Sequence, residues 1–139
     1  MLAYTNIISA GGPFTHQVWL AHLGTDVALT PMVEDTGIFT DKSPAWSLGG
    51  QWIAFLRKRI DQKTGNQVAL FNQTTGAVTT IADQGNYGDL MWNGSGQYIL
   101  IQKYPENPEK GSMQLLSYDT ASGRLSSVAD NAIQGKWLP

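Results

Sequence analysis

A segment that begins with tryptophan and ends in a run of apolar residues occurs twice in the chain. Residues 46–55 read Trp-Ser-Leu-Gly-Gly-Gln-Trp-Ile-Ala-Phe, and residues 92–101 read Trp-Asn-Gly-Ser-Gly-Gln-Tyr-Ile-Leu-Ile. The two leading tryptophans are 46 residues apart, and Trp137 follows 45 residues after the second. A repeat of this length is typical of a unit that buries its apolar faces only by stacking on its neighbours. It constrains the fold more than any other feature of the sequence.

Two further kinds of segment recur in a fixed order along the chain. One is found at 16–22, 66–72 and 112–118, and the other at 27–32, 78–83 and 125–130. All are short, rich in β-branched and aromatic residues, and bounded by Gly, Asn, Asp or Pro, as β-strands are. Apolar residues at helical spacing do not persist for three turns anywhere. The repeated unit is therefore expected to consist of strands.

We expect twelve strands in three groups of four. They are 2–5, 17–22, 26–31, 43–47, 51–57, 66–71, 77–82, 88–92, 97–103, 113–118, 124–129 and 134–138. Four antiparallel strands in a period in the mid-forties are typical of a β-propeller blade. The sequence thus predicts one all-β domain over 1–139 with three four-stranded antiparallel blades. Their bounds are 2–31 completed by 134–139, 43–82, and 88–129.

Residues 43–55 carry a resemblance to a known family. They resemble the WD40-like (PD40) repeat of TolB-type propellers, which reads Pro-x-Trp-Ser-Pro-Asp-Gly-x-x-Ile-Ala-Phe. Leu48-Gly49 replaces the usual Pro-Asp, and Asn93-Gly94-Ser95 replaces Ser-Pro-Asp, so glycine alone keeps the turn. The resemblance implies that Trp46, Trp92 and Trp137 are structural residues on equivalent innermost strands. It transfers no ligand-binding residue.

The chain begins and ends inside a repeat. Leu2-Ala3-Tyr4 matches residues 53–55 of a second strand, whereas residues 135–138 match the first strand that ends at Trp92. Three blades are too few to close a propeller, which usually has four to eight. We therefore expect a homodimer in which two chains complete a six-bladed ring, the usual count that the TolB resemblance implies. The alternative is that the chain is half of a longer propeller.

Unequal loop lengths point to one candidate binding face. The connections 6–16, 58–65, 104–111 and 32–42 are long, and in a four-stranded meander they emerge on the same face, near the channel mouth. The candidate ligand-binding residues on or beside them are Phe39, Asp41, Lys42, Arg59, Tyr87, Asp89, Tyr104 and Lys136.

Several functional classes are disfavoured by composition. The net charge of −2 and the short, acid-flanked basic run 57–59 give no reason to expect nucleic acid. With no cysteine and only two histidines, neither a metal site nor a cofactor is expected, and no acid–base pair predicts a catalytic residue. The first 25 residues lack Asp, Glu, Lys and Arg, but polar residues, glycine and proline interrupt them too often for a spanning helix. We expect a soluble chain without a signal peptide, and its compartment stays open.

The sequence favours a non-catalytic module that binds a peptide, a protein or a small ligand at the channel mouth. The alternative is an accessory propeller segment of a larger enzyme, such as a prolyl-oligopeptidase-like peptidase. A lyase or hydrolase with a site in the channel is less favoured because no acid–base or metal cluster is evident.

Overall fold

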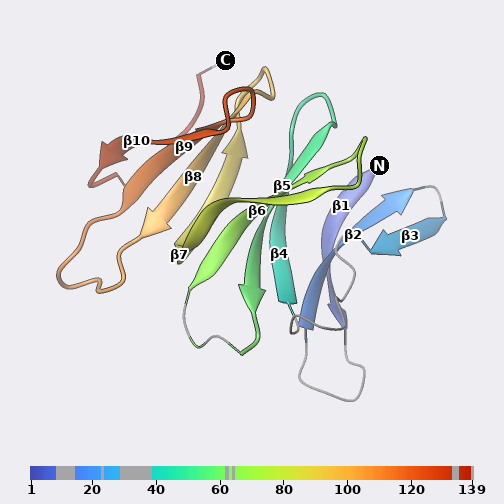
Figure 1. Ribbon diagram of the computed structural model, residues 1–139, viewed down its shortest axis with the longest axis horizontal. Coiled ribbons are helices and arrows are strands. Elements are labelled where there is room, and N and C mark those ends of the chain that lie inside the picture. Colours follow the sequence, from blue (N-terminus) through green and yellow to red (C-terminus); the bar gives the residue numbers. More distant parts are fainter. Residues whose placement is uncertain are drawn as a thin grey trace.

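A computed structural model describes residues 1–8, 15–22, 24–28, 39–61, 63, 65–132 and 135–138 of the chain (Figure 1). Over these residues it has strands and no helix, which confirms the expectation of an all-β chain. The strands are β1 (Leu2–Ile8), β2 (Thr15–His22), β3 (Thr25–Ala28), β4 (Phe39–Trp46), β5 (Trp52–Arg59), β6 (Asn66–Asn72), β7 (Val78–Trp92), β8 (Tyr98–Tyr104), β9 (Gln114–Asp119) and β10 (Arg124–Asp130). Part of the expected strand 26–31, residue 134 of the expected strand 134–138, and Pro139 lie outside the described residues.

Within each of two sheets, every strand pairs antiparallel with its neighbour in the sequence, and β3 and β4 belong to different sheets. One sheet has the order β1-β2-β3, and the other has the order β10-β9-β8-β7-β6-β5-β4. Figure 1 shows the loop 105–113, the end of β5 and the start of β6 at one end of the molecule, and the turns 47–51 and 93–97 at the opposite end. The connection 104–111 thus lies at the end where β5 finishes, whereas most of the connections 6–16 and 32–42, and residues 62 and 64 of the connection 58–65, lie outside the described residues.

The strand β7 belongs to two four-stranded groups. It pairs with β6 up to Gly85 and with β8 from Asn86 onward, and the register shifts on both sides of this point. We name the groups the first unit, from β4 to Gly85, and the second unit, from Asn86 to β10. The sequence suggested separate strands at 77–82 and 88–92 because Asp83, Gly85 and Asn86 are turn formers. The chain instead remains extended and passes from the first unit to the second without reversing.

A glycine with positive φ forms the turn between the first two strands of each unit. The Gly50 N–H donates to the Ser47 carbonyl at 2.9 Å, and the Gly96 N–H donates to the Asn93 carbonyl at 3.0 Å. Both glycines have positive φ, 70° and 72°. The two turns thus have the same geometry although neither contains the Pro-Asp of the related repeat.

The inner strands are apolar on both faces. On β5, Ala54 and Leu56 pack in the cluster between the first and second units, which also holds Val68 and Ile99. The alternate residues Ile53 and Phe55 pack in a second cluster with Val18 of β2 and Ala69 of β6. The first unit therefore lies between two neighbouring sheets, which is the packing expected of a stacked repeat.

The tryptophans that mark the repeat connect one unit to the next. The Trp92 indole Nε1 donates to the Ala45 carbonyl of the first unit at 2.9 Å. The Trp137 Nε1 donates to the Met91 carbonyl of the second unit at 3.0 Å. In both cases the acceptor carbonyl belongs to the residue just before the repeat tryptophan of the preceding unit. Residues 135–138, expected as a strand, pair with no strand in the described part of the chain, yet Trp137 makes the contact of a first strand.

The two adjacent glycines of the first turn allow a matched test of backbone strain. A Cβ added at Gly49 or at Gly50 would meet no atom within 4 Å, but only Gly50 has a left-handed φ. We expect Gly50→Ala to lower the free energy of unfolding by about 1 kcal/mol, because an L side chain is strained at that φ. Gly49→Ala should change it by less than about 0.5 kcal/mol. Urea denaturation measures both values, and equal effects would contradict the assignment of the turn.

Candidate functional site

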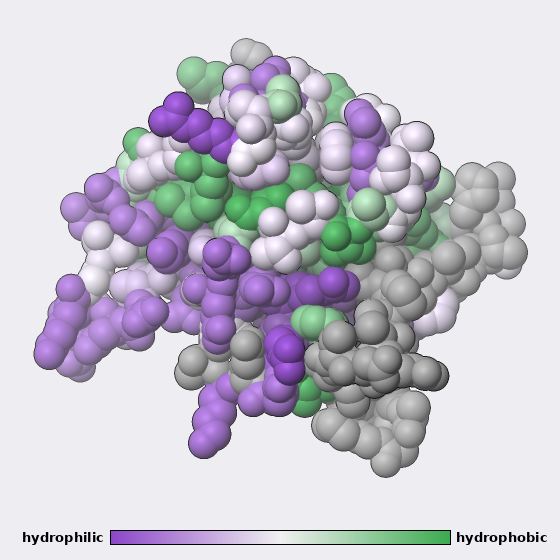
Figure 2. All heavy atoms as spheres, viewed as in Figure 1, coloured by the Kyte–Doolittle hydropathy of each residue, from purple (hydrophilic) through white to green (hydrophobic). Residues whose placement is uncertain are grey.

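A cavity of about 360 Å³ opens at the long-loop end of the molecule. We call it the long-loop cavity. Its lining side chains come from β2, β4, β5, β7, β8 and the start of β6, and Figure 2 shows hydrophilic residues gathered over this end. The lining residues are His16, Thr40, Lys42, Leu56, Lys58, Gly65, Asn66, Asn86, Tyr87 and Tyr104. Three of the residues predicted from loop lengths, Lys42, Tyr87 and Tyr104, therefore lie around one cavity.

Alternation along the strands selects the lining residues of the first unit. Thr40 pairs with Lys58, and Lys42 pairs with Leu56, across β4 and β5. All four line the cavity because alternate residues of a strand project to the same face. The residues between them project to the other face of the sheet.

That other face holds Arg57 in a closed polar cluster. The Arg57 Nε and Nη2 donate to the two Asp41 carboxylate oxygens at 2.9 and 3.0 Å, and Asp41 is fully buried. The guanidinium lies 4.8 Å from the ring centroid of Phe39 and 5.2 Å from that of Phe55. The predicted site residues Phe39 and Asp41 thus hold Arg57 and do not line the long-loop cavity. A bidentate pair of this kind is strong because each charge is matched as it leaves water.

Arg59, also a predicted site residue, forms an exposed ion pair with Asp61. Its Nε and Nη2 donate to the Asp61 carboxylate at 2.9 and 2.6 Å. These hydrogen bonds lower the pKa of Asp61 and raise the pKa of Arg59. Because both side chains are well exposed, water screens the pair and its contribution to stability is small.

An asparagine side chain fixes Tyr87 where β7 leaves one sheet for the next. The Asn66 Nδ2 donates to the Tyr87 carbonyl at 2.9 Å, and the Tyr87 N–H donates to the Asn66 Oδ1 at 2.8 Å. The side-chain amide thus replaces the backbone of a neighbouring strand. Burial, together with the negative charge of Asp83, raises the pKa of Tyr87, so its phenol is neutral at physiological pH.

Two glycines of β7 make room for the two tyrosine rings. A Cβ at Gly85 would lie 3.0 Å from the Tyr87 ring, and a Cβ at Gly88 would overlap the ring of Tyr104. The Tyr104 hydroxyl donates to the Gln102 Oε1 at 3.4 Å. The glycines flank Tyr87 closely in the sequence, and they allow both rings to pack directly against the backbone.

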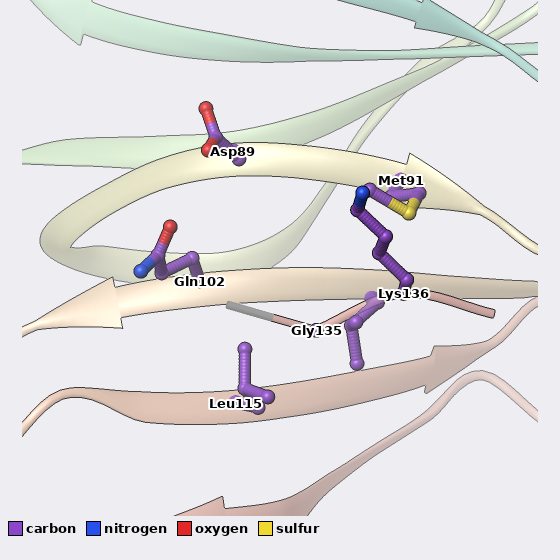
Figure 3. Close-up of a pocket in the computed structure, with 7 residues that line it drawn as sticks. Asp89, Met91, Gln102, Leu115, Gly135 and Lys136 are labelled. Atoms are coloured by element: carbon purple, nitrogen blue, oxygen red, sulfur yellow. The ribbon is translucent and has the colours of Figure 1, made fainter. Parts of the chain in front are cut away.

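The remaining predicted residues, Asp89 and Lys136, line a different and smaller cavity of about 60 Å³. It lies between the second unit and residues 135–136, and Leu100 and Leu115 form its apolar side. Figure 3 shows the Lys136 side chain extending from the chain toward Met91. A cavity of this size holds a few water molecules and is too small for a drug-sized ligand.

The long-loop cavity offers hydrogen-bond donors and positive charge. It has two lysines, an imidazole, two phenols and the Asn86 amide, and none of its described lining residues is a carboxylate. The Lys58 ammonium donates to the Lys63 carbonyl at 3.2 Å. The His16 ring lies close to Thr40, whose Oγ1 accepts the His16 backbone N–H at 3.0 Å. Sequence reasoning missed His16, Thr40, Lys58, Asn66 and Asn86, and strand alternation from Lys42 would have found Thr40.

No metal centre is evident in the described part of the chain. Among those residues, no three histidines, aspartates or glutamates converge as metal ligands would. The same residues contain no helix of the length and apolarity needed to cross a membrane.

Solved structures resemble the chain in their fold. A TolB protein from Agrobacterium tumefaciens matches 92% of this chain with a TM-score of 0.61 and 18% identity, over 45% of its own length. TolB from Acinetobacter baumannii matches 91% with a TM-score of 0.56 and 15% identity, over 29% of its length. The fold is that of a TolB-like β-propeller.

A third solved structure extends the likeness beyond the TolB proteins. The acylaminoacyl peptidase of Pyrococcus horikoshii matches 88% of the chain with a TM-score of 0.58 and 14% identity, over 22% of its length. No protein-family model matches the chain, and neither does any curated protein. The chain spans less than half the length of each of these three structures and so represents part of a propeller. At these identities the likeness establishes the fold alone.

The hydrogen bonds of Asn66 predict a stabilising role at the edge of the cavity. Asn66→Ala leaves the Tyr87 N–H and carbonyl without their partner, so we expect a loss of about 2 kcal/mol in the free energy of unfolding. Asn86→Ala, at the same cavity, should cost less than about 0.5 kcal/mol. Chemical denaturation compares the two, and an equal cost would show that the amide does not hold β7.

Proposed function

We propose that the chain is a non-catalytic β-propeller binding module that recognises a peptide or protein segment bearing carboxylates at the long-loop cavity. The observation that carries this proposal is the charge of the lining. Lys42 and Lys58 line the cavity without an acidic neighbour in its described lining, although the whole chain has a net charge of −2. The described lining thus carries two positive charges and no negative one, which favours a negatively charged ligand.

The other lining groups suit the same class of ligand. The Tyr87 phenol can donate a hydrogen bond to a carboxylate or carbonyl oxygen, and the rings of both tyrosines provide apolar area. Tyr87 and Tyr104 are held by glycine contacts and by strand pairing, so little ordering is needed when a ligand binds. A volume of about 360 Å³ is within the range of ligand pockets and accommodates a few side chains of an extended peptide.

A second candidate function is an accessory propeller segment of a larger enzyme. It is supported by the likeness to the acylaminoacyl peptidase of Pyrococcus horikoshii, of which the chain covers 22%. The two candidates differ in what the isolated chain does. A binding module retains its affinity for peptide alone, whereas an accessory segment requires the rest of the enzyme.

Charge-neutralising variants test the proposed site. The probe is a fluorescein-labelled hexaglutamate peptide, and binding is followed by fluorescence anisotropy at fixed ionic strength. The double variant of Lys42→Gln with Lys58→Gln should weaken binding on the order of thirtyfold, because it removes two charge-assisted contacts of about 1 kcal/mol each.

The control variant also removes two positive charges, at the same end of the molecule. Lys63→Gln combined with Lys110→Gln removes two exposed loop lysines that do not line the cavity. It should change the affinity by less than threefold. If both double variants weaken binding equally, the probe responds to overall charge and the cavity is not the site. Absence of binding by the unmodified chain would favour the accessory role.

A further inference from the structure

The contact between successive units repeats at the level of single atoms. The Trp92 Nε1 donates to the carbonyl of Ala45, the residue before Trp46. The Trp137 Nε1 donates to the carbonyl of Met91, the residue before Trp92. Each first strand thus bonds to the first strand of the unit before it. The rule predicts the acceptor for any tryptophan in this position.

Trp46 occupies the same position in the first unit but lacks the acceptor. Its indole Nε1 is buried and has no hydrogen-bond partner among the residues that the structure describes. The unit before it consists of β1, β2 and β3, in which β1 is an edge strand. By the rule of the other two tryptophans, the missing acceptor is a carbonyl on a first strand beside β1. A buried N–H without a partner is rare, because it loses its bond to water and gains nothing in return.

At the other end of the described chain, a first strand is present but the second strand beside it is missing. Residues 135–138 take the place of a first strand: Trp137 bonds to Met91 and lies against Tyr98, with ring centroids 6.4 Å apart. Gly135 packs on Leu100 and Leu115 so closely that a Cβ there would overlap the Leu100 side chain. In the described part of the chain no second strand pairs with these residues. Among the described residues, β1 therefore has no first strand beside it, and residues 135–138 have no second strand beside them.

An apolar hollow lies at each of these two ends, one beside Trp46 and one beside Trp137. A hollow of about 350 Å³ beside Trp46 is lined by Met1 and Leu48. Another of about 420 Å³ lies beside Trp137 and is lined by Tyr98 and Val128. Leu2 is 60% exposed at the first end, and Leu138 is 91% exposed at the second. Surfaces of this kind on stacked repeats normally require a cover.

We propose that a second copy of this chain covers both ends, with residues 135–138 of each copy pairing as the first strand beside β1 of the other. The Trp46 Nε1 then donates to the Lys136 carbonyl of the second copy, which is the residue before Trp137. The two junctions are equivalent by a two-fold axis, so the assembly closes. Three units from each copy form one ring of six. This proposal is independent of the ligand of the long-loop cavity.

The register of the new strand pair follows from the existing units. Trp46 is opposite Ile53 and Trp92 is opposite Ile99, while Ala45 and Met91 are opposite Ala54 and Leu100. Leu2 takes the place of Ile53, since it pairs with Ala21 of β2 as Ile53 pairs with Phe71 of β6. Trp137 of one copy should therefore be opposite Leu2 of the other, and Lys136 opposite Ala3.

A second copy fits better than an unrelated partner because the chain itself carries the complementary piece. The occupant beside β1 must supply a strand with an acceptor carbonyl at the position before a tryptophan. Residues 135–138 meet this requirement and need a second strand of their own. Three units alone are below the usual minimum of four for a closed propeller, whereas six are within the common range.

Solution mass provides the first test. Light scattering coupled to size exclusion, from about 1 to 200 µM chain, should give twice the 15.2 kDa of one chain. A folded 15.2 kDa monomer at 200 µM, or a mass of three or more chains, would overturn the proposal.

Two tryptophan variants distinguish the junction from the interior. Trp46→Phe removes the donor that the second copy satisfies and should weaken the dimer about tenfold, a typical effect of one buried hydrogen bond. Trp92→Phe removes a donor that bonds within the chain and should leave the dimer dissociation constant unchanged within twofold. Analytical ultracentrifugation measures both constants. An equal change in the two, or none in Trp46→Phe, would contradict the predicted contact.

Engineered cysteines test the register even if a tryptophan variant fails to fold. The chain has no cysteine, so A3C combined with K136C forms a defined pair. Under mild oxidation it should yield a disulfide-linked dimer, because residues opposite each other in neighbouring strands are within disulfide reach. The control N6C with K136C is three residues out of register and should not crosslink efficiently. Crosslinking of both pairs alike, of neither, or within a single chain would refute the proposed junction.

Discussion

The structure depends on sheets that are apolar on both faces. In β5, Ile53 and Phe55 face one neighbour while Ala54 and Leu56 face the other, and Val68 and Ala69 divide in the same way on β6. Such a sheet gains most of its stability from burial between two others, because apolar area removed from water is the main favourable term. No unit is then stable by itself, and the stack requires a cover at each end. The unpaired Trp46 indole and the exposed Leu138 are the atomic signs of this requirement.

The same stacking builds the long-loop cavity. The cavity lies where β7 passes from the first unit to the second, and the pairing of β7 there is irregular. Gly85 and Gly88 admit the tyrosine rings at this crossing, and Asn66 replaces the missing strand neighbour of Tyr87. Most of the lining groups therefore project from strands and not from loops, which gives the site a defined geometry.

The sequence allowed prediction of the strands whose pattern is local and periodic. The tryptophan segments and their glycine turns predicted the reversals, and the likeness to solved TolB structures supports the propeller fold. Alignment of the third strands at Phe71 and Ser117 was one residue out, since the structure places Phe71 and Tyr118 opposite equivalent isoleucines. Alternation cannot correct such a shift where both faces are apolar. At the site, β4 begins at Phe39 and its register shifts near Ser43, which has a φ of 56°. The predicted strand began at residue 43, so alternation was not applied to residues 39–42, and Phe39 and Asp41 were not separated from Thr40 and Lys42.

Dimer assembly and ligand binding depend on different residues of the chain. None of the described lining residues of the long-loop cavity belongs to β1 or to residues 135–138, so the cavity is built within one chain. Closing a two-fold ring would nevertheless place two identical cavities around a common axis. A ligand with two acidic segments and a suitable spacer could then bind both, and its affinity would exceed that of either segment because the second contact is intramolecular. The junction around Trp46 would thus determine the valency of the module, whereas Lys42, Lys58 and the two tyrosines would determine what it recognises.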